Sequence, residues 1–111
     1  MIEEWELTFW SEGESSPPVQ EWLDDLTQEQ LKAISKELML LKKAGNKLRI
    51  PHSKPIDTSL FELRERRFGY RVYYTFDKGK IIILIAAGDK SSQKRDIKIA
   101  RERLAKLKGG K

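Results

Sequence analysis

The stretch LFELRERRFGYRVYYTF, residues 60–76, decides how the chain folds, because apolar and polar side chains alternate along it. Alternation with a period of two is typical of β-strands that bury one face of a sheet. It predicts one strand over residues 60–66 and a second over residues 68–76, with a turn near residues 67–69. The arginines inside this stretch must therefore lie on one of the two faces.

The same alternation sorts the side chains of these two strands into an apolar face and a polar face. The apolar face holds Phe61, Leu63, Tyr70, Val72, Tyr74 and Phe76. The polar face holds Glu62, Arg64, Arg66, Arg71, Tyr73 and Thr75. In a hairpin, the inner members of the polar face become cross-strand neighbours, and we expect them to stay open to solvent. These neighbours are Glu62, Arg64, Arg71 and Tyr73.

The segments on either side supply the other elements. Residues 2–9 alternate and predict a first strand, and IIILIAA, residues 81–87, predicts a buried one. Residues 17–26, 27–44 and 95–108 carry apolar residues at helical spacing. Ser16 is expected to cap the first helix, a Thr27–Gln30 capping box to begin the second, and Gly45 to end it. Residues 46–59 are expected to form a loop.

The predicted order is β-α-α-β-β-β-α, which indicates an α+β fold. We expect a small, mainly antiparallel sheet with two N-terminal helices on one face and a C-terminal helix. The length of 111 residues suits a single domain, residues 1–111.

Charge is distributed unevenly along the chain. Residues 1–45 carry a net charge of −6 and residues 46–111 a net charge of +11, which gives +5 overall. Such polarity favours a polyanionic partner such as nucleic acid. Solvated charge on helix faces is the alternative explanation.

Composition excludes several classes of protein and site. The sequence contains no cysteine, which rules out disulfides and thiolate chemistry. No apolar run approaches the roughly 20 residues of a membrane span, and the acidic N-terminus lacks the layout of a signal peptide. We expect a cytoplasmic protein with no membrane contact, no cofactor and no metal, because one histidine without a helical pair of carboxylates makes no metal site.

A face that carries several arginines has two interpretations. Guanidinium groups hold several N–H donors in a fixed geometry that suits bidentate hydrogen bonding to phosphate, and a tyrosine hydroxyl adds another donor. Pairing of Glu62 with Arg64 or Arg71 as ordinary surface ion pairs would instead contribute little. The loop after the last strand adds Lys90, and the charge asymmetry favours phosphate binding.

The order of the motifs resembles the RelE/ParE superfamily of toxins. LFELR, YRVYYTF and the buried IIILIAA are followed by a lysine-bearing loop and a basic terminal helix, as in that superfamily. SPPVQEWLDDL and LRIPHSKPI resemble its HigB-like, phage-related branch. The likeness extends over nearly the whole chain.

This resemblance implies the toxin component of a type II toxin-antitoxin system. Most RelE- and HigB-type members are mRNA interferases, which cleave mRNA in the ribosomal A site and so inhibit translation. Each is neutralised by a cognate antitoxin. In the HigB-like branch the antitoxin is usually a helix-turn-helix protein, through which the pair binds operator DNA and represses its own operon. The partners that the resemblance implies are thus an antitoxin, the ribosome and mRNA.

The resemblance also implies roles for individual residues. Arg71 matches an arginine that acts on the scissile phosphate in RelE, and Arg64 falls where RelE has a catalytic lysine. Glu62 falls at a second such lysine, which is a departure from the RelE pattern. Lys90 lies near the position of another RelE arginine. RelE has a tyrosine at the start of its terminal helix, where this sequence has Asp96 or nearby residues. The resemblance therefore assigns no residue to the proton-transfer step.

Endoribonuclease activity of this type proceeds by attack of an RNA 2′-hydroxyl on the adjacent phosphate. The reaction needs a base, cations for the added charge, and an acid for the leaving oxygen. Arg71 and Lys90 are candidates for charge stabilisation, Arg64 for holding the backbone, and Glu62 for the base. Tyr73 or Lys94 is the candidate acid. Further candidate RNA-binding cations are Arg66, Arg67, Lys94, Arg95 and Lys54.

Two other features each have two interpretations. His52 belongs to the type of side chain that titrates near neutral pH, so it is a further catalytic candidate, although a histidine between two prolines more often hydrogen-bonds to backbone. The basic terminal helix is expected to contact ribosomal RNA or to be covered by the antitoxin. Its apolar stripe is expected to be core and not interface: Ile97, Ala100, Leu104 and Leu107.

Two rival functions remain at this point. A ParE-like toxin poisons DNA gyrase on the same scaffold, but it would not need the cluster of Arg64, Arg71 and Lys90. A basic RNA-binding or operon-regulating protein without catalysis is the second rival. Single-stranded RNA binders usually carry several aromatic platforms, whereas Tyr73 is the one aromatic residue that the alternation puts on the basic face.

Overall fold

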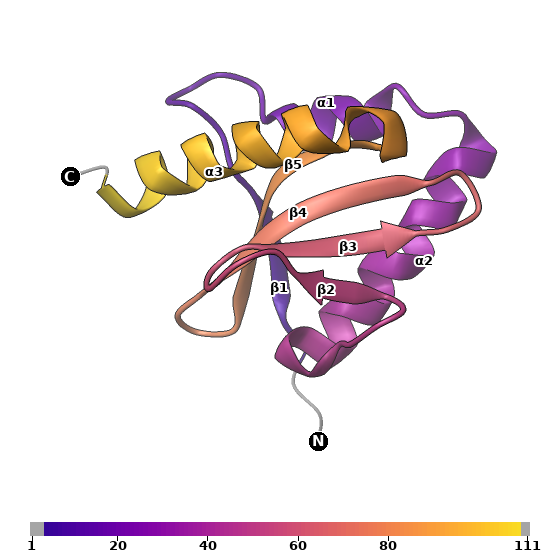
Figure 1. Cartoon of the computed structure of the whole chain (residues 1–111), viewed down its shortest axis with the longest axis horizontal. Helices are drawn as coiled ribbons and strands as arrows, with labels where there is room; N and C mark the ends of the chain where they lie inside the picture. Colours follow the sequence, from indigo (N-terminus) through magenta and orange to yellow (C-terminus); the bar gives the residue numbers. More distant parts are fainter. Residues whose placement is uncertain (1–3, 110–111) are drawn as a thin grey trace.

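The computed structural model describes residues 4–109. Figure 1 shows helices packed against a single twisted sheet. The strands are β1 (Glu6–Phe9), β2 (Ser53–Pro55), β3 (Phe61–Glu65), β4 (Tyr70–Asp77) and β5 (Ile81–Asp89). The helices are α1 (Pro18–Asp24), α2 (Gln28–Ala44) and α3 (Gln93–Gly109), with short 3₁₀ turns η1 (Gly45–Lys47) and η2 (Lys90–Ser92).

The sheet has the order β1-β5-β4-β3-β2. Its strands pair antiparallel except for β1 and β5, which pair parallel. The predicted α+β class and mainly antiparallel sheet are therefore confirmed. One strand was not predicted, because β2 lies in the segment expected to be a loop. It has three residues and ends at Pro55, so it carries almost no periodic signal.

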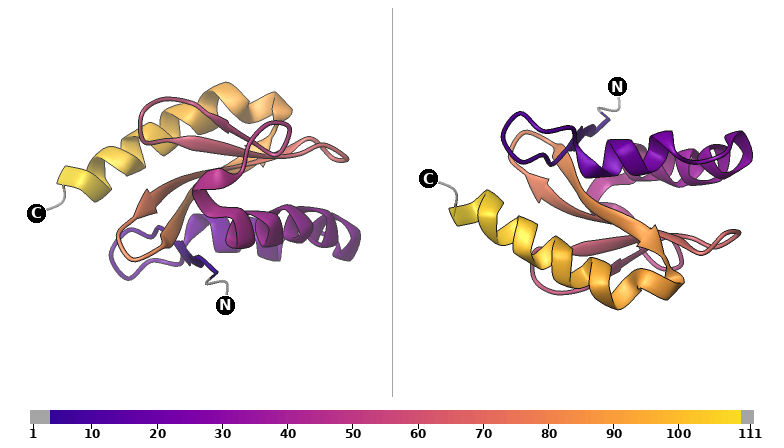
Figure 2. Two further views of the ribbon diagram at one scale, coloured as in Figure 1. Left: turned by 90° about the horizontal axis from the view of Figure 1, so that it is seen from below. Right: turned by 90° about the horizontal axis from the view of Figure 1, so that it is seen from above.

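Three layers make up the molecule. Figure 2 shows α1 and α2 on one side of the sheet and α3 on the other. The prediction of two N-terminal helices on one face is confirmed. The C-terminal helix covers the opposite face, where its residues Ile97, Ala100 and Leu104 pack with Tyr73 and Ile85. That part of the apolar stripe is core, as predicted, whereas Leu107 is 41% exposed.

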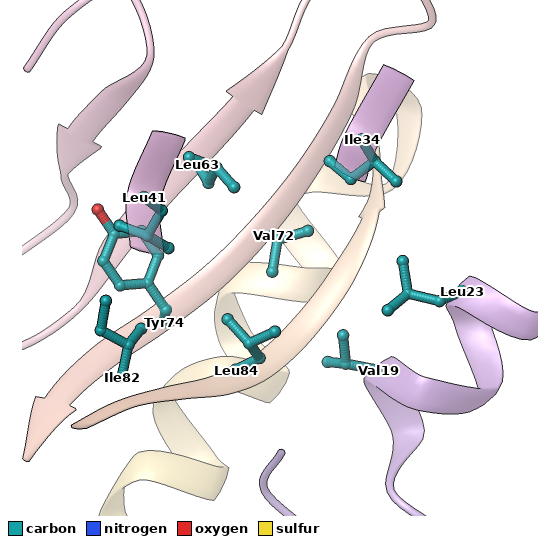
Figure 3. Packing of buried hydrophobic residues seen from close by; sticks show 9 residues of the cluster. All are labelled: Val19, Leu23, Ile34, Leu41, Leu63, Val72, Tyr74, Ile82 and Leu84. Carbon is teal, nitrogen blue, oxygen red and sulfur yellow. The ribbon is translucent and has the colours of Figure 1, made fainter. Parts of the chain in front are cut away.

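The face under α1 and α2 is closed by apolar side chains alone at its centre. Figure 3 shows this cluster, to which α2 contributes Ile34 and Leu41 and the sheet contributes Leu63 and Val72. All four are 0% exposed. Burial of this kind stabilises a fold by about 25 cal/mol per Å² of apolar surface removed from water.

The ends of the N-terminal helices follow partly from the sequence. Thr27 and Gln30 form the predicted capping box, and Gly45 ends α2 with a φ of 55°. A side chain at Gly45 would also collide with the indole of Trp5, whose Nε1 would lie 2.0 Å from the added Cβ. Ser16 does not cap α1 as predicted. Pro17 occupies the cap position instead, because adjacent prolines already hold the backbone in the required conformation.

Within residues 4–109, no helix is long and apolar enough to span a membrane.

Candidate functional site

Strand pairing brings the polar residues predicted from alternation into two adjacent rows. Both rows lie on the face of the sheet that α3 covers, because directly opposite side chains share a face. They run across β2, β3, β4 and β5. The first row consists of Lys54, Glu62, Tyr73 and Ala86. The second row consists of Arg64, Arg71 and Gly88.

The prediction that this polar face stays open to solvent is wrong. Tyr73 is 0% exposed, Glu62 1% and Arg71 8%, and only Arg64 keeps a third of its side chain in contact with water. The cause is α3, which turns back over β4 and β5 directly after the sheet ends (Figure 2). The arginines are thus part of a buried polar layer and not an open surface.

Glu62 lies between the two arginines. Its Oε1 is 3.5 Å from Nε of Arg64, and its Oε2 is 3.4 Å from Nε of Arg71. Gln93, the first residue of α3, donates from Nε2 to Glu62 Oε2 at 2.7 Å. Arg71 also donates from one terminal nitrogen to the carbonyl of Gly69 at 3.2 Å. The carboxylate therefore occupies the position between two guanidinium groups where an external anion would otherwise be held.

Three buried polar atoms of this layer have no hydrogen-bond partner within residues 4–109. They are Oε1 of Glu62, Nε of Arg71 and the hydroxyl of Tyr73. Burial, reinforced by the negative charge of Glu62, raises the pKa of Tyr73 far above its ordinary value, so the phenol stays protonated. Two of these atoms, Oε1 of Glu62 and Nε of Arg71, take part in the ion pairs described above, so the Tyr73 hydroxyl alone of the three has neither a hydrogen bond nor an ion pair in the described part of the chain.

The start of α3 rests on a position without a side chain. A Cβ at Gly88 would lie 1.9 Å from Oδ2 of Asp96 and 2.5 Å from the hydroxyl of Ser92, so only glycine lets the helix approach so closely. Ser92 donates to Asp96 Oδ2 at 2.5 Å. Asp89 accepts the backbone N–H groups of Ser91 and Ser92. The buried Asp96 thus fixes the helix over Arg71, the cross-strand neighbour of Gly88.

Sequence reasoning missed Gln93 and the group formed by Gly88, Asp89 and Ser92. One signal was available. Aspartate followed by serines is typical of the residues that cap a helix, so GDKSSQK could have been recognised as a helix start and not as a loop.

The other predicted cations surround this layer at different places. Lys90 lies beside the β3–β4 turn, since a Cβ added to Gly69 would lie 3.9 Å from the Cβ of Lys90. Arg67 lies over the ring of Phe68 and 3.5 Å from Glu29 of α2. The remaining predicted RNA-binding cations are all exposed: Arg66, Lys54, Lys94 and Arg95.

His52 contacts the cluster through its backbone, since its carbonyl accepts the N–H of Arg64 at 2.8 Å, while its side chain is directed to α2. Its Nδ1 is 3.0 Å from Oε1 of Glu37 on α2, so it bonds to a carboxylate and not to backbone. Within residues 4–109, no three histidine, aspartate or glutamate side chains gather closely enough to hold a metal ion.

Comparison with known proteins places this geometry in a family. The model of the family described as "Phage derived protein Gp49-like (DUF891)" matches residues 21–105. A protein of Haemophilus influenzae named "Uncharacterized protein" is 45% identical over 49 residues, which are 43% of this chain. The chain spans about half the length of that curated relative, since the match covers 50% of it.

Two solved structures of the Escherichia coli RelE toxin share the fold. The isolated toxin superposes with a TM-score of 0.57 at 19% identity, covering 86% of this chain and 98% of RelE. A double arginine-to-alanine mutant of RelE in the free state gives a TM-score of 0.58 at 16% identity, covering 86% and 96%. The resemblance to RelE is confirmed at the level of the fold, while the HigB-like branch stays a prediction.

Proposed function

This chain belongs to the Gp49-like family of phage-derived proteins, and from that premise we propose that it is the toxin of a type II toxin-antitoxin system. Its activity in this proposal is ribosome-dependent cleavage of mRNA in the cytoplasm. Its partners are the ribosome, mRNA and a cognate helix-turn-helix antitoxin, through which alone it reaches operator DNA. The shared RelE fold supports the proposal.

The single observation that carries the proposal is the arrangement around Glu62. Two guanidinium groups converge on one anion, with nitrogen–oxygen distances of 3.5 and 3.4 Å, in a layer where Glu62 and Arg71 are buried. These distances are longer than those of close charge-assisted hydrogen bonds, so the arginines retain capacity to bind another anion. A phosphate offers more acceptor atoms to the same arginines than a carboxylate does.

In the proposed mechanism, the scissile phosphate replaces Glu62 as the anion between Arg64 and Arg71. Arg64 makes the first contact, because it is the more exposed of the two arginines. Arg71 then stabilises the charge that develops on the phosphate. The displaced Glu62 carboxylate accepts the proton of the attacking 2′-hydroxyl. Lys90 adds positive charge beside the β3–β4 turn.

The leaving 5′-oxygen needs a proton donor. Tyr73 was one candidate, but burial and the negative charge of Glu62 raise its pKa far above the ordinary value, which makes it a poor proton donor at neutral pH. We assign this step to Lys94, which is exposed and follows Gln93 at the start of α3.

A second candidate function is favoured by the burial of Arg71 and Glu62. At 8% and 1% exposure, this pair has the character of a structural ion pair. In that case the protein would act without cleaving RNA, as a gyrase poison on the same fold or as a basic RNA-binding and operon-regulating protein.

The test is induced expression in a bacterial host, with growth recorded and the 5′ ends of a translated reporter mRNA mapped. Wild type is compared with Arg64→Ala and Arg71→Ala, and Lys78→Ala in the exposed β4–β5 turn is the matched control. We expect arrest with in-frame cuts in the wild type and the control, and loss of both in the two arginine variants. Circular dichroism of each purified protein establishes that it is folded.

Other outcomes would redirect the assignment. Arrest without cuts would reject mRNA cleavage, and accumulation of gyrase–DNA complexes would then identify the ParE-like activity. No arrest by a folded, expressed wild type would leave the non-catalytic function.

A further inference from the structure

A cavity of about 380 Å³ lies on the opposite face of the sheet from the arginine cluster. It is bounded by η1, the segment after it, β2 and the outer parts of β3 and β4. Its walls are largely apolar, with Leu48, Ile50, Pro55, Phe61 and Phe76 contributing side chains. Its volume falls within the range of about 300–1,000 Å³ that is typical of ligand sites. We refer to it as the η1 cavity.

Two buried hydroxyl groups inside the η1 cavity are hydrogen-bonded to each other. The hydroxyls of Ser53 and Tyr74 are buried and lie 2.5 Å apart. Figure 3 shows Tyr74 at the margin of the apolar cluster. The two hydroxyls bond to each other, and most of the remaining lining is apolar, so a ligand that enters here meets mainly apolar surface and should present an apolar group to it.

The rim of the cavity is basic. Arg49 lines it and is held in place by hydrogen bonds from one terminal nitrogen to the carbonyls of Asn46, at 2.7 Å, and Leu48, at 3.2 Å. Lys47 is exposed between two lining residues. None of the ion pairs within residues 4–109 involves Arg49 or Lys47, and no acidic residue lines the cavity. The rim therefore offers a fixed guanidinium without an anionic partner.

The lip of the cavity exposes an unusual amount of apolar surface. Ile50 is 69% exposed, which is the largest exposed fraction among the large hydrophobic residues of the described chain. An exposed isoleucine beside an apolar cavity and a basic rim is typical of a docking surface.

We propose that the η1 cavity binds an acidic segment of a partner protein. One bulky apolar side chain of that segment fills the cavity, and a neighbouring carboxylate pairs with Arg49. Such pairing of an apolar anchor with a rim charge is a common arrangement in interfaces. The inference goes beyond RNA cleavage and does not depend on it, since a ligand here lies across the sheet from Arg64 and Arg71.

A flipped RNA base is the rival occupant, and the observations favour it less. A base carries ring nitrogens and carbonyls that need hydrogen-bond partners, whereas the buried hydroxyls of the cavity are already paired. Burying those base atoms against Leu48, Ile50 and Phe76 would leave them unsatisfied.

The experiment selects twelve-residue peptides from a random display library on the purified full-length protein. We expect enriched peptides that combine acidic residues with a bulky apolar residue. Binding of one such peptide is then measured by fluorescence anisotropy to wild type, Ile50→Ser and Arg49→Glu. The matched controls are Met39→Ser, an exposed apolar residue of α2, and Lys78→Glu, an exposed cation outside the cavity.

We expect Arg49→Glu to weaken peptide binding at least about tenfold, because it places like charges together. Ile50→Ser should weaken it about three- to tenfold, and both controls should leave it unchanged. Replacing the acidic residues of the peptide with their amides should reproduce the Arg49→Glu loss.

Three outcomes would overturn the proposal. These are a library without enrichment, peptides that bind Ile50→Ser and Arg49→Glu as tightly as wild type, and a short single-stranded RNA whose binding is lost in Ile50→Ser while peptides do not bind. The last would identify a base-binding site. None of these readouts depends on growth arrest or RNA cleavage, so a failed proposal here is distinguishable from a failed proposed function.

Discussion

Tyr73 and Tyr74 are neighbours in β4, yet the two faces of the sheet treat their hydroxyls in opposite ways. The hydroxyl of Tyr74, on the α2 face, bonds to Ser53 at 2.5 Å. The hydroxyl of Tyr73, on the α3 face, has no hydrogen-bond partner within residues 4–109. Both rings are buried. One face is therefore packed and satisfied, while the other holds charges and unpartnered atoms at a cost to stability.

This difference separates what the fold needs from what a function needs. The α2 face follows the ordinary rules of a core, with apolar side chains and paired polar groups. The α3 face is apolar toward the middle of α3 and polar toward its start, where Glu62, Arg71 and Asp96 are buried. A buried ion cluster is weak evidence for stability, because apolar residues often serve as well. The proposed RNA cleavage would give the cluster a role that packing does not.

Removing the buried cation should have the largest effect. Arg71→Met leaves Glu62 buried with Arg64 as its remaining cation, and we expect the free energy of unfolding to fall by about 3–5 kcal/mol. Urea denaturation followed by circular dichroism measures this change. The double variant Glu62→Leu/Arg71→Met should return to within about 1 kcal/mol of wild type. A double variant less stable than Arg71→Met would show that the cluster stabilises the fold.

The next largest loss of stability should follow truncation of a side chain on the apolar face under α1 and α2. Leu63→Ala removes a side chain that is 0% exposed in the apolar cluster, and we expect a loss of about 3 kcal/mol in the free energy of unfolding. Met39→Ala, at a position 51% exposed, is the control and should change it by less than about 0.5 kcal/mol. Equal losses in the two variants would contradict the assigned core.

The two tyrosines should respond with opposite signs. Tyr74→Phe breaks the bond to the buried Ser53, so we expect it to lower the free energy of unfolding by about 1–2 kcal/mol. Tyr73→Phe removes an unpartnered hydroxyl, so we expect a gain of about 1 kcal/mol. Thermal and urea denaturation of both variants measure the difference. A loss in Tyr73→Phe would show that its hydroxyl has a partner in solution.

The smallest expected effect is on the free energy of unfolding at alkaline pH. Burial raises the pKa of Tyr73, and also those of Tyr74 and Tyr70, above the unfolded value of about 10. A raised pKa means that the unfolded chain loses its proton first, so stability is complete below about pH 10 and falls as the pH rises further. The decline should be shallower in Tyr73→Phe than in the control Tyr70→Phe. Equal slopes in the two variants would contradict this assignment.

Much of the fold could be predicted because its signals are local. Alternation along residues 60–76 defines the faces of β3 and β4, and the capping box at Thr27 defines the start of α2. β2 escaped prediction because three residues carry no period. The parallel placement of β1 beside β5 also left no local signal, since it depends on how the whole chain is arranged.

The sequence predicts which residues of the candidate site lie together, but it does not predict that they are buried. Cross-strand register follows from alternation, so the grouping of Glu62, Arg64, Arg71 and Tyr73 could be anticipated. Their burial depends on where α3 docks, and docking depends on the contact of Asp96 with Gly88. Residue spacing along one strand does not reveal a contact between a helix and a glycine in another strand.

The parallel pairing of β1 with β5 has a consequence for how the protein is made. Glu6 pairs with Ile81, and Figure 1 shows β1, in indigo, beside β5, in orange. The first strand in the chain therefore cannot pair in the sheet until the last strand is available. Contacts between such distant parts of a chain form late. A growing chain on the ribosome therefore lacks a complete sheet until β5 has emerged. Under the proposed activity, the arginine cluster is likewise incomplete until β5 and α3 have emerged, because Arg71 pairs with Gly88 of β5 and Gln93 of α3 bonds to Glu62.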